Sequence, residues 1–124
     1  MGHGARAAVM VVDDDATIRE LLAEVLQMFG LDVSCAANGR DALARLRCGA
    51  LRPDAIVLDL DMPVMNGWQF RREQLLDPML ADIPVLVASG SDTGAIRADG
   101  HLTKPYGMDE LLGALRNLTM RRAA

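Results

Sequence analysis

The chain has little of what builds a disulfide scaffold, a membrane protein or a nucleic-acid-binding protein. Its 124 residues include two cysteines, too few for a disulfide framework, so we expect reduced thiols in a cytoplasmic protein. No apolar run approaches the roughly 20 residues that a membrane-spanning helix needs, and the start lacks a signal-peptide pattern. The net charge of −4 gives no reason to expect direct binding to nucleic acid or a membrane surface.

What is present suits one globular domain. Hydrophobic residues make up 51% of the chain, and a chain of this length buries roughly two-thirds of its unfolded surface. We therefore expect a single domain over residues 1–124, with its core between about 7 and 120. No internal repeat or low-complexity linker interrupts it.

Short apolar runs alternate with segments of helical periodicity. Strands are expected at about 7–12, 31–36, 55–60, 84–88 and 101–103, and helices at about 16–28, 39–48, 68–76 and 108–119. This alternation predicts a doubly wound, parallel α/β sheet with helices on both faces. The stretch 90–100 has three glycines and one large apolar residue, Ile96. It is too short for a mean helix with its connections, so we expect a loop or at most one helical turn there.

Polar residues follow the ends of four of these strands. Asp13 and Asp14 follow the first strand, Asp59 lies at the end of the third, Ser89 follows the fourth and Lys104 the fifth. Strand ends of one polarity meet at one edge of a parallel sheet, so these side chains are expected to converge. Carboxylates suit Mg²⁺, and a hydroxyl and an ammonium group suit phosphoryl oxygens. Each residue alone has an ordinary structural explanation, but their joint occurrence predicts a site for Mg²⁺ and a phosphoryl group.

In this order the residues resemble the receiver domains of bacterial two-component response regulators. The resemblance rests on Val11-Val12-Asp13-Asp14, on Leu58-Asp59-Leu60-Asp61-Met62-Pro63 with Met65 and Gly67, on Ser89-Gly90 and on Lys104-Pro105. It implies a flavodoxin-like sheet of five parallel strands in the order 2-1-3-4-5. That family carries a fourth helix where this chain has residues 90–100. The chain therefore departs from the pattern, with a fourth helix that is short or missing, and we expect that it cannot present the family's usual output surface in the ordinary way.

The resemblance also implies a chemical role for each acidic residue. Asp59 would be the phospho-acceptor, taking a phosphoryl group from a sensor histidine kinase or a phosphotransfer protein. Asp14 and Asp59 would bind Mg²⁺ through their side chains, and Asp13 through a bound water. The backbone carbonyl of Asp61 would complete the protein ligands of the metal.

Other positions are implied to respond to the phosphoryl group or to tune its lifetime. Lys104 would pair with Asp59 at rest and afterwards with a phosphoryl oxygen, while Ser89 would take another oxygen and carry the switch. His101 stands where the family places an aromatic switch residue, although an ordinary histidine on an edge strand explains it equally well. Asp61 and Ser91 lie two positions after the acceptor and the hydroxyl, and would modulate hydrolysis of the acyl phosphate.

These observations favour a phosphorylation-dependent signalling switch that catalyses its own phosphorylation and dephosphorylation and acts by protein–protein interaction. One alternative is a phosphatase of the haloacid-dehalogenase type, whose Asp-x-Asp pattern Asp59-Leu60-Asp61 imitates, although Pro63 stands where threonine or valine is usual. A second is an interaction module that is never phosphorylated. If 124 residues are the native length, output comes from binding another protein; if not, the chain belongs to a larger regulator or a hybrid kinase.

Overall fold

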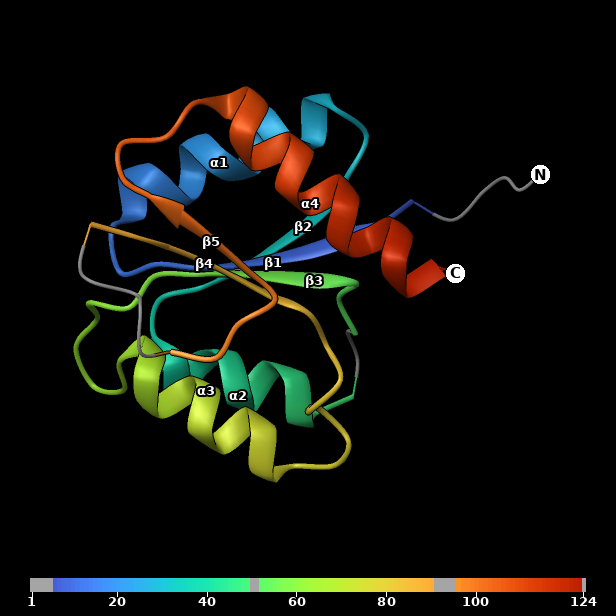
Figure 1. Cartoon of the computed structure of the whole chain (residues 1–124). Coiled ribbons are helices and arrows are strands. Elements are labelled where there is room, and N and C mark those ends of the chain that lie inside the picture. Colours follow the sequence, from blue (N-terminus) through green and yellow to red (C-terminus); the bar gives the residue numbers. More distant parts are fainter. Residues whose placement is uncertain (1–5, 50–51, 91–95, 124) are drawn as a thin grey trace.

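Five parallel strands form one sheet in the order β2-β1-β3-β4-β5 (Figure 1). The computed structural model describes residues 6–49, 52–90 and 96–123. The strands are β1 (Ala8–Val12), β2 (Asp32–Ala36), β3 (Ala55–Leu58), β4 (Val85–Ser89) and β5 (Gly100–Thr103). The helices are α1 (Ala16–Met28), α2 (Gly39–Arg47), α3 (Gly67–Leu76) and α4 (Met108–Ala123). The predicted fold class and strand order are therefore confirmed.

Helices α1 and α4 cover one face of the sheet, and α2 and α3 cover the other (Figure 1). Side chains alternate between the two faces of a strand, so a strand covered on both sides must be apolar throughout. In β1, Val9 and Val11 pack with α1 and α4, whereas Met10 and Val12 pack with α2 and α3. The uninterrupted apolar run of β1 thus reflects its central place in the sheet.

Side-chain caps begin the first three helices directly after the loops that leave the strands. The carboxylate of Asp15 accepts hydrogen bonds from the backbone N–H groups of Thr17 and Ile18. Asn38 caps α2 in the same way, and Asn66 caps α3 within a capping box. Such caps satisfy backbone donors that a helix start leaves without partners. They also fix where each strand-end loop stops, and these loops carry the predicted site.

Two elements differ most from their expected bounds. Strand β3 ends at Leu58 rather than at residue 60, so Asp59 begins the following loop. Helix α4 continues to Ala123, beyond the expected end at 119.

Within the described residues, no helix connects β4 to β5. Gly90 and residues 96–99 are not helical, which agrees with the expected loss of the fourth helix, while Ser91 falls outside the described residues. The side chain of Ile96 is buried in the core on the α2–α3 side of the sheet. This short segment therefore covers part of the sheet that a helix would otherwise cover.

A polar group formed by the buried Arg71 and Gln74 and the exposed Asp99, called here the Arg71 network, holds residues 96–99 against α3. Arg71 Nε donates to the carbonyl of Arg97 at 2.7 Å, and its Nη1 donates to Gln74 Oε1 at 2.7 Å. Arg71 Nη2 also lies 3.6 Å from Asp99 Oδ2, which accepts from the backbone N–H of Val85 at 2.8 Å. The Arg71 network thus joins α3, the connection between β4 and β5, and the start of β4.

Candidate functional site

The register of the two central strands brings Asp13 and Asp59 together. Val12 of β1 pairs with Leu58 of β3. Each of these is the last residue of its strand, and each acid follows it directly. The backbone N–H of Asp59 donates to the carbonyl of Val12 at 2.9 Å, and that of Asp13 donates to Ala36 at 3.2 Å. Both acids are therefore held by backbone hydrogen bonds at one edge of the sheet.

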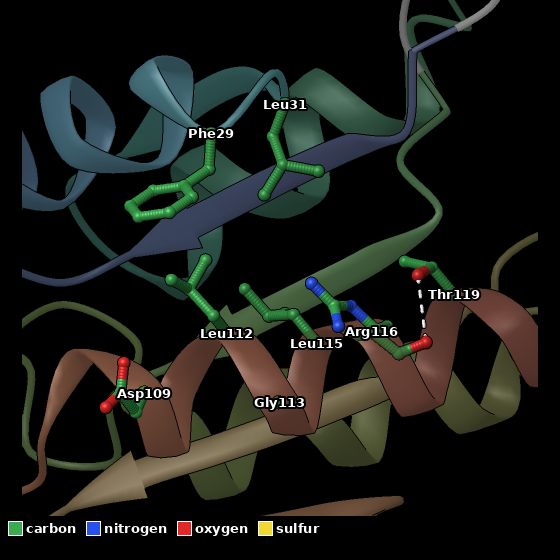
Figure 2. A pocket seen from close by; sticks show the side chains of 8 residues that line it. All are labelled: Phe29, Leu31, Asp109, Leu112, Gly113, Leu115, Arg116 and Thr119. Carbon is green, nitrogen blue, oxygen red and sulfur yellow. Dashed lines mark hydrogen bonds between the residues drawn. The ribbon is translucent and has the colours of Figure 1, made fainter.

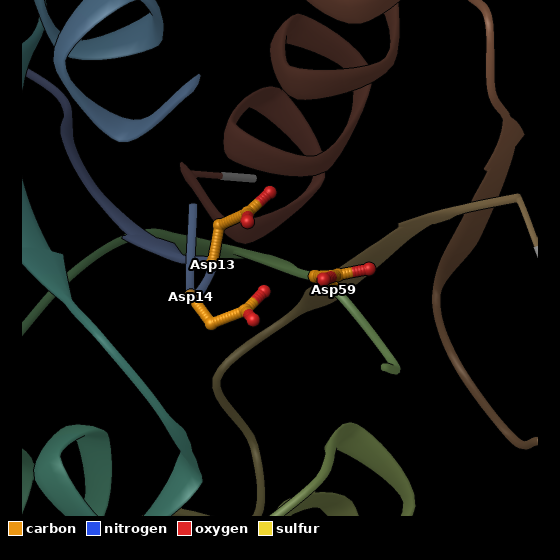
Figure 3. Close-up of side chains that lie close together, drawn as sticks. All are labelled: Asp13, Asp14 and Asp59. Atoms are coloured by element: carbon orange, nitrogen blue, oxygen red, sulfur yellow. The ribbon is translucent and has the colours of Figure 1, made fainter. Parts of the chain in front are cut away.

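Three carboxylates meet at this edge (Figure 3). Each of Asp13, Asp14 and Asp59 offers one oxygen, and these oxygens lie within 4.8 Å of one another. Asp13 and Asp59 are 5% and 7% exposed, whereas Asp14 is open to solvent. This group, called here the acid cluster, concentrates negative charge where water screens it poorly. Its all-oxygen donor set fits a hard divalent cation such as Mg²⁺.

Lys104 is the cation that the fold supplies to the acid cluster. Its Nζ lies 3.5 Å from Asp13 Oδ2 and 3.6 Å from Asp59 Oδ1. The backbone N–H of Lys104 donates to the carbonyl of Ser89 at 3.1 Å, so β4 and β5 fix the position from which the side chain extends. Among the described residues, Lys104 is the one cation in ion-pair contact with any of the three carboxylates, so the edge keeps an excess of negative charge that a divalent cation would offset.

The pKa of Asp59 is set first by burial and then by the neighbouring charges. Burial raises the pKa of the Asp59 carboxyl above its ordinary value, Lys104 lowers it, and the charges of Asp13 and Asp14 raise it further. For Lys104, burial lowers the pKa, but Asp59 and Asp13 more than offset this, so the net shift is upward. A raised pKa means that a group keeps its proton up to a higher pH. Both shifts therefore favour the protonated form of the group, and so positive charge, at the acid cluster.

Ser89 lies beside the site at the end of β4 and is fully buried. Its hydroxyl donates to Asp61 Oδ2 at 3.5 Å. This contact links the residue implied to carry the switch, Ser89, with the residue implied to modulate hydrolysis, Asp61. His101 of β5 pairs with Val87, two residues before Ser89, so the two side chains belong to the same face of the sheet. The imidazole Nε2 of His101 lies 3.3 Å from the carbonyl of Ile96.

The structure thus brings Asp13, Asp14, Asp59 and Lys104 together and places Ser89 against Asp61. Sequence reasoning missed Arg19 of α1, whose Nη1 donates to the backbone carbonyl of Asp13 at 2.8 Å. No motif marks this arginine. The available signal was its place on the helix that starts directly after the acids.

A cavity of about 420 Å³ lies elsewhere, between the C-terminal end of α1 and helix α4 (Figure 2). Apolar side chains, among them Phe29 and Leu112, line it, with Asp109 and Arg116 at its polar positions. Helix α1 starts next to the acid cluster at Ala16, whereas Phe29 caps its other end. The length of the helix therefore separates this cavity from the acid cluster.

No helix within the described ranges is long and apolar enough to cross a membrane.

Comparison with known proteins places this arrangement in a family. The family model of the response regulator receiver domain matches residues 9–116. The transcriptional regulatory protein SphR of Synechococcus elongatus, a regulator of alkaline phosphatase synthesis, is 40% identical over 127 residues, covering 91% of this chain and 49% of SphR. The chain spans about half the length of the curated relatives that it matches.

Solved structures agree with the sequence relatives. The chemotaxis protein CheY4 of Vibrio cholerae superimposes with a TM-score of 0.83 at 33% identity, over 92% of this chain and 99% of CheY4. The response regulator TrrA of Thermotoga maritima, solved in complex with Mg²⁺ and BeF, gives a TM-score of 0.79 at 29% identity, over 90% of this chain and 98% of TrrA. On its sequence, its strand order and the model that it matches, the chain belongs to the family of response regulator receiver domains.

Proposed function

We propose that the chain is a cytoplasmic phosphorylation switch in which Asp59 accepts a phosphoryl group from a sensor histidine kinase or a phosphotransfer protein. Membership of the receiver family supports a phosphorylation-dependent signalling role. The acceptor, the metal ligands and the partner are our proposal for this chain. The observation that carries it is the meeting of three carboxylate oxygens within 4.8 Å, with the Lys104 ammonium group at 3.5–3.6 Å from two of the carboxylates.

In the proposed reaction, a carboxylate oxygen of Asp59 attacks the phosphorus of a phosphohistidine. A P–O bond forms and the P–N bond breaks; its electron pair leaves with the imidazole, which takes up a proton. Phosphoryl transfer asks the protein for positioning and charge neutralisation more than for covalent chemistry. Lys104 favours the ionised form of Asp59, which is the nucleophile, because the two side chains lie 3.6 Å apart.

The residues of the acid cluster would hold Mg²⁺, with Asp14 and Asp59 as side-chain ligands, Asp13 acting through water and the carbonyl of Asp61 completing the set. The cation supplies neutralisation of the charge on the phosphoryl oxygens. Asp14 is the open member of the cluster, and Asp13 and Asp59 are its buried members. A cation could therefore approach from solvent beside Asp14, while the strands fix the two buried carboxylates.

Ser89 and Lys104 would each take a phosphoryl oxygen, and Ser89 would report the phosphorylated state to a partner protein. Because Ser89 Oγ lies 3.5 Å from Asp61 Oδ2, we propose that this contact breaks when the hydroxyl turns to the phosphoryl group. Asp61 and Ser91 would then modulate hydrolysis of the acyl phosphate. His101 would transmit the change through β5 to its contact at Ile96.

The test is binding of beryllofluoride, a phosphoryl analogue, followed by ¹⁹F NMR with and without Mg²⁺. We expect binding only with Mg²⁺, and none in Asp59→Asn, which lacks the anionic acceptor. Asp15→Asn is the matched control, since it removes a neighbouring acid outside the acid cluster and asparagine caps helices as well as aspartate does.

Each alternative function has its own outcome in this experiment or in a parallel assay of phosphomonoester hydrolysis. Wild-type protein that fails to bind beryllofluoride with Mg²⁺ contradicts the switch and favours an interaction module that is never phosphorylated. Steady turnover of a generic phosphomonoester, lost in Asp59→Asn, favours a phosphatase. Equal binding by wild type and Asp59→Asn removes Asp59 from the role of acceptor.

A further inference from the structure

We propose that Arg19 is a positioning residue for the cation site, acting on the peptide bond between Asp13 and Asp14. This inference rests on the proposed function, because it concerns the Mg²⁺ that the acid cluster would bind. Arg19 lies on the first turns of α1, and its Nη1 donates to the carbonyl oxygen of Asp13 at 2.8 Å. A guanidinium donor makes this a charge-assisted hydrogen bond, which is stronger than one between neutral groups.

The hydrogen bonds around Asp13 show why this carbonyl matters. The Asp13 carboxylate is held on both oxygens, by the backbone N–H of Asp15 at 2.9 Å and by Lys104 at 3.5 Å. Its backbone N–H is held by the carbonyl of Ala36. Arg19 occupies the remaining group, the carbonyl, and so every polar group of Asp13 has a fixed partner.

Asp14 has no comparable support of its own. Its side chain is exposed, and across the part of the chain that the structure describes no hydrogen bond or ion pair holds it. Its direction therefore depends on the peptide planes on either side. Arg19 holds the plane before Asp14 through the Asp13 carbonyl. The hydrogen bond from the N–H of Asp15 to Asp13 Oδ1 holds the plane after it.

Arg19 has a second effect of opposite sign, which makes the inference testable. Among the described residues Arg19 forms no ion pair with a carboxylate, so no acid neutralises its charge. Because its guanidinium lies against the Asp13 carbonyl, we expect this positive charge to oppose the binding of a cation at the acid cluster. Removing this charge tightens Mg²⁺ binding by about twofold, as expected for one partly exposed charge. Removing the hydrogen bond frees the peptide and weakens binding by about tenfold, the lower end for groups that orient metal ligands. Positioning therefore predicts a net loss of affinity, and charge alone predicts a gain.

The experiment is calorimetric titration of the full chain with Mg²⁺. We expect the dissociation constant to rise about fivefold in Arg19→Ala, the tenfold loss being partly offset by the twofold gain. Arg19→Lys keeps the charge and a donor, so it should stay within about threefold of wild type. The matched control is Arg45→Ala. Burial raises the pKa of the Cys35 thiol, and Arg45 opposes that rise as Arg19 does, but Arg45 bonds to the Asp41 carboxylate and not to the acid cluster.

A second readout needs no metal. Hydrogen exchange of the Asp14 amide in metal-free protein should speed up in Arg19→Ala and stay at the wild-type rate in Arg45→Ala. If Arg19→Ala does not fold, Arg19→Met takes its place, because it keeps the aliphatic stem without the donor.

The outcomes separate the two proposals. Affinity that is unchanged or tighter in Arg19→Ala, while Asp14→Asn still weakens binding, overturns the role of Arg19 and leaves the Mg²⁺ site intact. Wild type that does not bind Mg²⁺, or Asp14→Asn that binds as well as wild type, overturns the site itself. An equal loss in Arg19→Ala and Arg19→Lys, with unchanged Asp14 exchange, also contradicts positioning.

Discussion

The acid cluster and the Arg71 network are both groups of partly buried charges, but they are balanced differently. The acid cluster sets three carboxylates against one lysine, and burial, together with the charges of Asp13 and Asp14, raises the pKa of Asp59. The Arg71 network sets one guanidinium against one carboxylate and two well-formed acceptors. Buried charge that lacks compensation costs stability, whereas buried charge with full hydrogen bonding does not. The difference indicates a binding site in the first case and a structural brace in the second.

The largest expected effect is the loss of the brace. Arg71→Met removes three partners at once and leaves Gln74 Oε1 and the carbonyl of Arg97 unpaired. Leaving the buried Gln74 Oε1 without a donor, together with the lost bond to Arg97, should lower the free energy of unfolding by about 3 kcal/mol, measured by urea denaturation. Arg72→Met, at the next and exposed position of α3, should stay within about 0.5 kcal/mol. Similar losses in both variants would show that the network contributes nothing beyond helix packing.

A smaller effect is expected where α3 meets the acid cluster. A Cβ added at Gly67 would lie 2.5 Å from the carbonyl oxygen of Asp59 and 2.8 Å from Leu60 Cα. Backbone atoms cannot yield as a flexible side chain does, so Gly67→Ala should cost about 2 kcal/mol by overpacking. Gly113→Ala is the control, because a Cβ there meets nothing within 4 Å. Urea denaturation measures the stability of both variants. An unchanged free energy of unfolding in Gly67→Ala would mean that the backbone at Asp59 and Leu60 shifts at no cost.

Asp59→Asn should stabilise the fold, which is the reverse of the effect at Arg71. It removes a buried carboxylate from a cluster with excess negative charge, and the gain expected is about 1 kcal/mol at pH 7. The pKa of Asp59 is raised in the folded state, so its contribution to stability is present below the unfolded value and is lost as pH rises through the folded pKa. The gain from Asp59→Asn should therefore shrink from pH 7 towards pH 4.

Urea denaturation of wild type and Asp59→Asn across that pH range checks this prediction. The pKa of Lys104 is raised above an ordinary value that is already alkaline, so its titration does not enter the window. A gain that stays constant with pH would indicate that burial and repulsion do not act on Asp59 as the geometry indicates.

The smallest effect is expected at His101 of β5, which contacts the connection between β4 and β5. Its Nε2 lies 3.3 Å from the carbonyl of Ile96, and its side chain is exposed. His101→Phe should change the free energy of unfolding by less than about 0.5 kcal/mol, in contrast to Arg71→Met. A larger loss in thermal or urea denaturation would make His101 part of the brace.

Much of the site followed from the sequence because strand ends are local features. Asp13, Asp59 and Lys104 were predicted to converge from the apolar runs that precede them, and the parallel register brings them together.

The sequence by itself determined the order of the elements, the polar residues at the strand ends and the absence of a helix in residues 96–99. These depend on periodicity, on glycine content and on chain topology, which act over a few residues. Only the tertiary structure decided that Arg71 bonds to the carbonyl of Arg97, 26 positions away, and that Arg19 reaches the carbonyl of Asp13. Both arginines bind backbone carbonyls, which every residue carries, so no motif marks the acceptor, and packing alone sets the direction of each side chain.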